Sequence, residues 1–117
     1  MMTVLDHGAL LFTEGKEVSF PLPDSPSVLV APLLRHEDGH SADVFFLTIP
    51  ADASVPREQH PFSETLVPLA GQLTCSVDDE PPMTIRPGQA LHIPADQIHF
   101  VANQHDEPVV AAMIIGV

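Results

Sequence analysis

The chain has 117 residues, of which 44% are apolar, and this is the size of one ordinary domain with one hydrophobic core. Sixteen acidic residues against four basic ones give a formal charge of −12, so the field of the whole protein repels phosphate backbones and anionic membrane surfaces. We therefore expect neither nucleic acid nor a membrane as a partner.

The N-terminal part gives the weakest structural signal. Residues 1–17 lack a basic region followed by a long apolar run, so we expect no signal peptide and a cytoplasmic location. The single cysteine, Cys75, has no partner for an internal disulfide, which fits a reducing compartment. We interpret residues 1–27 as an edge strand and a proline-stiffened connection within a single domain that spans residues 1–117.

The rest of the chain has the pattern of short strands separated by turns. Thirteen prolines argue against long helices, because each one removes a backbone hydrogen-bond donor. Turn residues such as HEDGH at 36–40 and DDEPP at 78–82 separate runs rich in branched apolar side chains. In chain order, the predicted strands are residues 28–35, 43–50, 65–71, 72–77, 83–86, 90–94, 98–103 and 108–117. This spacing predicts an all-β sandwich or barrel.

Polar side chains gather just before the strand predicted at 65–71. Glu58 and His60 share a face if their segment is extended, and Glu64 follows four residues later. His99 lies in a later predicted strand. Imidazole favours Fe, Ni, Zn and Cu, whereas carboxylate favours Mn and Mg, so the four side chains together would suit a borderline divalent metal. Spacing alone leaves open that this stretch is a solvated turn.

The remaining candidate residues carry weaker signals. Cys75 alternates with apolar neighbours, so we expect a buried filler rather than a reactive thiol. His92 is expected at the surface or at a pocket rim, and Phe62 and Phe100 either line a pocket or belong to the core. Four other histidines are expected to be exposed: His7, His36, His40 and His105.

Two stretches resemble the two sequence motifs of the cupin family. Residues 52–71, DASVPREQHPFSETLVPLAG, follow the spacing G-x5-H-x-H-x3-E-x6-G, with His60, Glu64 and Gly71 in place. Residues 88–103, GQALHIPADQIHFVAN, follow the spacing G-x5-P-x-G-x2-H-x3-N, with matches at Gly88, Pro94, His99 and Asn103. The resemblance implies an antiparallel double-stranded β-helix, also called a jelly-roll barrel, and a homodimer.

Three positions depart from the cupin motifs. Asp52 and Asp96 replace glycines at turn positions that Asp tolerates better than most residues. Glu58 stands where the family has its first metal-binding histidine. The resemblance thus implies a divalent first-row metal held by Glu58, His60, Glu64 and His99. The extra carboxylate favours Mn or Fe, with Ni or Zn as further candidates. The alternative is that the exchange at Glu58 has abolished metal binding.

Two functions remain open at this point. The first is a metal-dependent enzyme of dioxygenase, isomerase or decarboxylase type that acts on a small oxygenated molecule, with Glu64 as a ligand that also moves a proton. The second is a binding or sensory module that recognises a small molecule without catalysis, with or without a metal. The sequence does not indicate the substrate.

Overall fold

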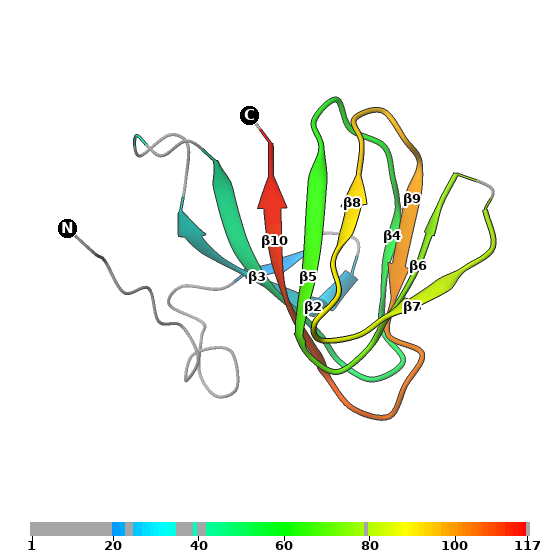
Figure 1. The fold of residues 1–117 in the computed structure, drawn as a ribbon. Helices are drawn as coiled ribbons and strands as arrows, with labels where there is room; N and C mark the ends of the chain where they lie inside the picture. Colours follow the sequence, from blue (N-terminus) through cyan, green and yellow to red (C-terminus); the bar gives the residue numbers. More distant parts are fainter. Residues whose placement is uncertain (1–19, 23–24, 35–38, 40–41, 79, 117) are drawn as a thin grey trace.

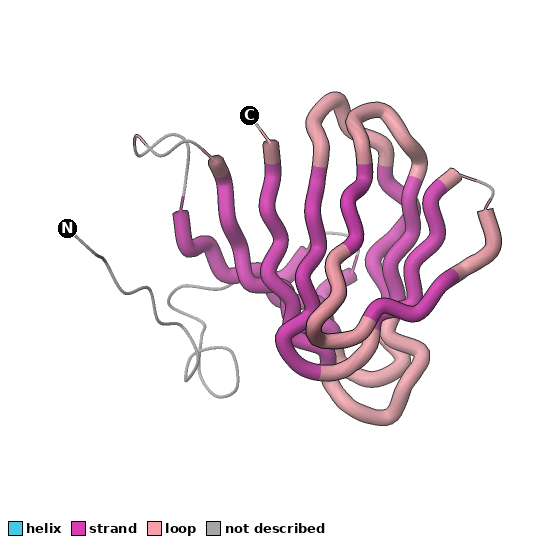
Figure 2. The backbone as a smooth tube through the Cα atoms, viewed as in Figure 1, coloured by secondary structure: helices cyan, strands magenta, loops and turns pink. Residues whose placement is uncertain are grey.

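The computed structural model describes residues 20–22, 25–34, 39, 42–78 and 80–116. Within these residues the chain forms strands and loops without a helix (Figure 2). The ten strands are β1 (Phe20–Leu22), β2 (Ser25–Leu34), β3 (Asp43–Ile49), β4 (Ser54–Glu58), β5 (Glu64–Ala70), β6 (Leu73–Val77), β7 (Met83–Ile85), β8 (Leu91–Ile93), β9 (His99–Ala102) and β10 (Val109–Ile115).

The strands form two antiparallel sheets that face each other (Figure 1). The larger sheet has the order β1-β2-β3-β10-β5-β8, and the smaller sheet has the order β4-β9-β6-β7. The prediction of an antiparallel jelly-roll barrel is therefore confirmed. Each of the eight predicted strands forms a strand, with ends that differ by up to three residues. No helical segment in the described part of the chain has the length and hydrophobicity that a membrane crossing requires.

Strand β4 was absent from the predicted strands, and its composition explains why. Its sequence, SVPRE, contains a proline and two charged residues, which are uncommon in a central strand. In the structure β4 is an edge strand that pairs only with β9 within the smaller sheet, and the pairing register shifts between Val55 and Glu58. An edge position tolerates proline because no neighbouring strand needs its missing N–H.

The core lies between the inner faces of the two sheets. Alternate residues of the strands point inward, and the largest fully buried apolar side chains include Ile49, Leu66, Leu73 and Ile93. Cys75 belongs to the same core and is 1% exposed. Its predicted role as a buried filler is confirmed, and burial in apolar surroundings raises the pKa of its thiol to about 12.

The two aspartates that replace motif glycines occupy left-handed backbone positions. Asp52 has φ 60° and Asp96 has φ 68°, a region that Asp enters at lower cost than most residues. Of residues 1–27, expected to form an edge strand and a connection, residues 1–19, 23 and 24 lie outside the described part. Residues 20–22 form β1, which pairs with β2 at the edge of the larger sheet.

Candidate metal centre

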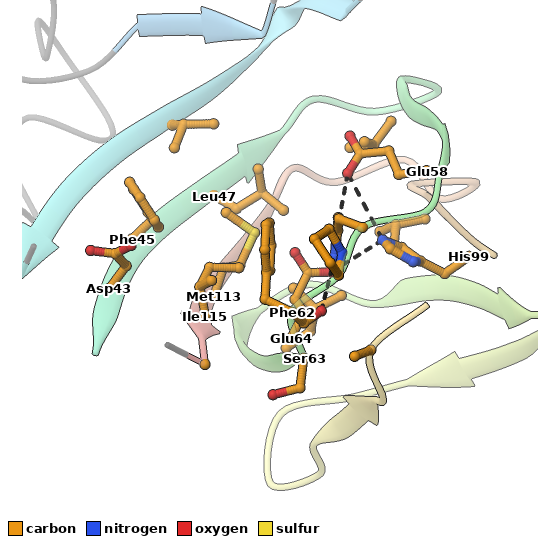
Figure 3. Close-up of a pocket in the computed structure, with 18 residues that line it drawn as sticks. Asp43, Phe45, Leu47, Glu58, Phe62, Ser63, Glu64, His99, Met113 and Ile115 are labelled. Carbon is orange, nitrogen blue, oxygen red and sulfur yellow. Dashed lines mark hydrogen bonds and ion pairs between the residues drawn. The ribbon is translucent and has the colours of Figure 1, made fainter. Parts of the chain in front are cut away.

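Strand pairing brings two of the candidate ligands together. In the β4–β9 pair Glu58 lies directly opposite His99, and His60 follows two residues after the end of β4. Each of these three side chains offers one potential ligand atom, and the three atoms lie within 4.8 Å of one another. Figure 3 shows Glu58 and His99 converging on one side of a pocket. Residues 41 positions apart in sequence thus meet through the register of a single strand pair.

Two loops hold His60 in place. The backbone N–H of Asp96 donates to the carbonyl oxygen of His60 at 2.8 Å, and Gln59 Nε2 donates to the carbonyl oxygen of Asp96 at 2.8 Å. The ring of Phe62 stacks on the imidazole of His60, with ring centroids 4.1 Å apart and an interplanar angle of 10°. These contacts join the loop after β4 to the loop before β9 and restrict the orientation of the imidazole.

In each of the two imidazoles, Nδ1 lies within hydrogen-bonding distance of a backbone carbonyl oxygen. His60 Nδ1 lies 3.0 Å from the carbonyl oxygen of Phe62, and His99 Nδ1 lies 3.1 Å from the carbonyl oxygen of Gln97. A carbonyl oxygen can only accept a hydrogen bond, so both Nδ1 atoms carry the proton. In the neutral ring this leaves a free lone pair on each Nε2, which is the arrangement found in metal-binding histidines.

Both Nε2 atoms face carboxylate oxygens at distances beyond a hydrogen bond. His60 Nε2 lies 3.8 Å from Glu58 Oε2, and His99 Nε2 lies 3.9 Å from the same oxygen. His99 Nε2 also lies 3.4 Å from Glu64 Oε2. An unprotonated imidazole nitrogen and a carboxylate oxygen are both acceptors, so a cation between them, either a proton or a metal ion, would stabilise this arrangement.

Glu64 is the most deeply buried acid of the described residues. It is the first residue of β5 and is 5% exposed. It contacts the centre at His99, but it lies outside the group of three side chains whose ligand atoms are within 4.8 Å of one another. Burial raises the pKa of the Glu64 carboxyl, His99 and His60 lower it, and Glu58 raises it again. A bound divalent ion would favour the ionised carboxylate in the same place. The two imidazoles and the Glu58 carboxylate are a donor set that fits a borderline divalent metal, and the Glu64 carboxylate lies beside them.

The centre opens on a cavity of about 720 Å³ that is lined by 18 residues (Figure 3). Glu58, His60, Glu64 and His99 all belong to its wall. Most of the other lining side chains are apolar, and β3, β5 and β10 contribute Phe45, Leu47, Leu66, Met113 and Ile115. The sequence indicated strands with alternating apolar residues there, but not which end of each strand would face the candidate ligands.

The weaker candidates lie at varied distances from this centre. Phe62 lines the cavity and is 38% exposed, whereas Phe100 is half-buried and does not line it. His92 is exposed, and its Nδ1 bonds the hydroxyl of Thr65 at 2.9 Å. His105 is half-buried rather than exposed, because its loop packs on Asn103. His7, His36 and His40 lie outside the described residues.

Asn103, which the motif resemblance singled out, has a structural role. It is 1% exposed, and its Nδ2 donates to the carbonyl oxygens of Ile49 at 3.0 Å and Glu107 at 2.7 Å. Its Oδ1 accepts the backbone N–H of His105 at 3.0 Å. The side chain therefore satisfies the backbone of the loop between β9 and β10 instead of reaching the cavity.

The family model of the cupin domain matches residues 45–115, which is more than half of the chain, so the chain belongs to the cupin family. This range contains the whole centre. No curated protein sequence matches the chain closely enough to count as a relative.

Solved structures share the fold at low sequence identity. A predicted oxalate decarboxylase from Thermotoga maritima is 16% identical with a TM-score of 0.79, covering 98% of this chain and 99% of that one. The cupin domain of an XRE family transcriptional regulator from Enterobacter cloacae is 22% identical with a TM-score of 0.69, covering 78% of this chain and 97% of that one. The Cnp3 cupin domain of Schizosaccharomyces pombe is 16% identical with a TM-score of 0.71, covering 80% of this chain and only 63% of that one. These likenesses establish the fold and leave the activity open.

Proposed function

We propose that this cupin is a small metalloenzyme that acts on a small oxygenated molecule. In this proposal Glu58, His60, Glu64 and His99 hold one divalent first-row ion at the wall of the cavity. The observation that carries it is the placement of two Nε2 atoms at 3.4 to 3.9 Å from carboxylate oxygens, with the Nδ1 atoms of both imidazoles held by backbone carbonyls. Two carboxylates among the ligands favour Mn or Fe, and Ni or Zn are further candidates.

The side chains of the centre have distinct tasks in this proposal. The ion would supply a Lewis acid or a redox centre for an oxygen of the substrate. Phe62 holds His60 by stacking and excludes water from one side of the ring. Glu64 lines the cavity and contacts the centre, so its carboxylate can take a proton from the substrate and the protonated carboxyl can then return one. Dioxygenase, isomerase and decarboxylase chemistry all fit this arrangement.

Elemental analysis of protein purified without an affinity tag tests the proposal. We expect a first-row divalent ion near one per chain, and we expect His99→Ala to remove it. Even changes outside the ligand set weaken metal binding by about 10 to 100-fold, so loss of a ligand has at least that effect. His92→Ala is the matched control, because His92 is an exposed histidine that does not line the cavity. Equal metal content in both variants would contradict the proposed ligand set.

The second candidate is a binding or sensory module built on the same barrel. The similarity to the cupin domain of a transcriptional regulator favours it, since that domain belongs by its name to a regulatory protein. Glu58→His separates the two functions. In a working centre this variant keeps a metal and shifts selectivity toward Ni, Zn or Cu. In a centre that has lost its metal, Glu58→His creates metal binding that the parent lacks. That outcome would favour the sensory module as the function of the natural protein.

A homodimer and a cytoplasmic location complete the proposal. The side chains of Phe46, Val67, Ala112 and Ile114 form an apolar patch on the outer face of the larger sheet, here called the outer patch. Val67 and Phe46 both lie opposite Ala112 on neighbouring strands, so the patch is continuous. A second copy of the chain could cover it. The buried thiol of Cys75 suits a reducing compartment.

A further inference from the structure

The cavity has a polar end and a much larger apolar body. The centre forms the polar end, and Phe45, Leu47, Met113 and Ile115 line the body, which β3 and β10 provide. Figure 3 shows Phe45 on the side of the cavity away from Glu58 and His99. The volume of about 720 Å³ lies in the range of pockets that enclose whole small molecules. A molecule of two or three carbon atoms would leave most of these apolar walls without contacts.

The cavity lining combines acids with imidazoles. Among the described residues it holds three acids, Asp43, Glu58 and Glu64, and two histidines, His60 and His99, but no Lys or Arg. Arg57 and Arg86, the two arginines of the described part, are exposed and do not line this cavity. Away from the centre, an anionic group buried against Leu47, Met113 and Ile115 would lose its hydration and gain no ion pair from these walls, and such burial is strongly unfavourable. The net charge of −12 opposes anions over a longer range.

We infer that the natural occupant has a neutral, largely apolar body of at least ring size and one oxygen-bearing end that faces the centre. This inference rests on the proposed function for the orientation of the occupant, whereas the choice of a neutral apolar body rests on the cavity walls.

Binding of a matched pair of probes tests this inference. 2-Naphthol and 2-naphthoate share one ring system and differ in charge at neutral pH. The chain has no Trp or Tyr, so the fluorescence of either probe can be followed without protein background. For the protein dialysed against a chelator, we expect 2-naphthol to bind at least about tenfold more tightly than 2-naphthoate, a difference that corresponds to about 1.4 kcal/mol. Equal or tighter binding of 2-naphthoate would overturn the inference.

A charged side chain introduced into the cavity wall provides a second test of the inferred occupant. Met113 is a half-buried side chain of the cavity wall, and Met113→Lys should weaken 2-naphthol binding by about tenfold and strengthen 2-naphthoate binding. Met83→Lys is the control, because Met83 is 49% exposed and does not line this cavity. If Met113→Lys does not fold, Met113→Gln keeps the length of the side chain and should still weaken 2-naphthol binding. The same response in the Met113 and Met83 variants would place the probe elsewhere and overturn the inference.

The two proposals fail in distinguishable ways. A protein that never holds a metal but prefers 2-naphthol contradicts the proposed function and supports the apolar occupant. A protein that holds one metal per chain but prefers 2-naphthoate in the chelated state supports the centre and overturns the occupant.

Discussion

The imidazoles of His60 and His99 are both oriented by backbone carbonyls two residues away in sequence, at Phe62 and Gln97. Each loop therefore fixes the tautomer of its own histidine without help from a distant side chain. This local arrangement explains how the centre keeps its shape although Glu58 replaces a histidine. The Glu58 side chain is 40% exposed, so a carboxylate at this position retains part of its hydration.

Glu64 is expected to destabilise the metal-free protein. Its pKa is raised in the folded state, mainly by burial, so folding disfavours the ionised form. The folded state then binds the proton more tightly than the unfolded chain, and stability falls as pH rises from the ordinary value of 4.5 through the raised pKa. Glu64→Gln should therefore increase the melting temperature of the metal-free protein at neutral pH.

Thermal unfolding of the chelated protein at several pH values measures this effect. A change of 1 kcal/mol shifts the midpoint of a domain of this size by roughly 2 to 8 °C, so the effect is measurable. The difference between parent and Glu64→Gln should shrink as pH falls through 4.5, because the carboxyl is protonated in both states well below that pH. Glu80→Gln, at an exposed position, serves as the control. A variant that is less stable than the parent at neutral pH would show that Glu64 stabilises the fold instead.

At the scale of elements, the turn after β5 places a strict demand on one glycine. Gly71 has φ 78°, and a Cβ atom there would lie 2.5 Å from the carbonyl oxygen of Pro108 and 3.0 Å from Val109 Cα. Gly88 also has positive φ, at 93°, but a Cβ atom there would meet no atom within 4 Å. A comparison of Gly71 with Gly88 therefore separates the cost of a left-handed backbone conformation from the cost of a steric clash.

Gly71→Ala should reduce the free energy of unfolding by about 3 kcal/mol or more, because conformational strain and a clash with backbone act together. Gly88→Ala should reduce the free energy of unfolding by only about 1 to 2 kcal/mol, which is the cost of the left-handed conformation for a residue with a Cβ atom. Denaturant unfolding of both variants measures the difference. Equal losses would mean that the loop before β10 moves away from residue 71 at little cost.

The same scale shows what the sequence could predict. Runs of branched apolar residues between turns located eight strands, and the spacing of two motifs indicated the barrel. Strand β4 was missed because its pairing depends on β9, about 45 residues later, and not on its own composition. For the centre, residue types and spacing indicated Glu58, His60, Glu64 and His99 as ligands. Their role as ligands remains a prediction.

Other features of the site depend on tertiary structure alone. The carbonyl contacts of the two imidazoles follow from loop conformation, which no side-chain pattern encodes. The cavity wall from β3 and β10 follows from the position of β10 beside β3 in the larger sheet. Sequence spacing could not show that Phe45 and Met113 share a cavity with His99, because these residues are brought together only by closure of the barrel.

For the whole molecule, the outer patch makes a prediction about assembly. Sedimentation should find a dimer of the parent protein, and Ile114→Asp should shift it toward a monomer, because a charge would be buried in the interface. Ile114 is 37% exposed in the single chain, so the substitution leaves the core intact. Met83→Asp, on the smaller sheet, should leave the dimer unchanged. A parent that stays monomeric at all accessible concentrations would contradict the dimer.

The position of β10 also bears on how the protein is made by the ribosome. β10 follows every other described strand in sequence, yet it lies between β3 and β5 in the larger sheet (Figure 1). While the chain is being translated, β3 and β5 therefore lack their shared neighbour until residues 109–115 have left the exit tunnel. The barrel can close only after these residues have emerged, and until then the nascent chain has exposed strand edges that chaperones would need to shield.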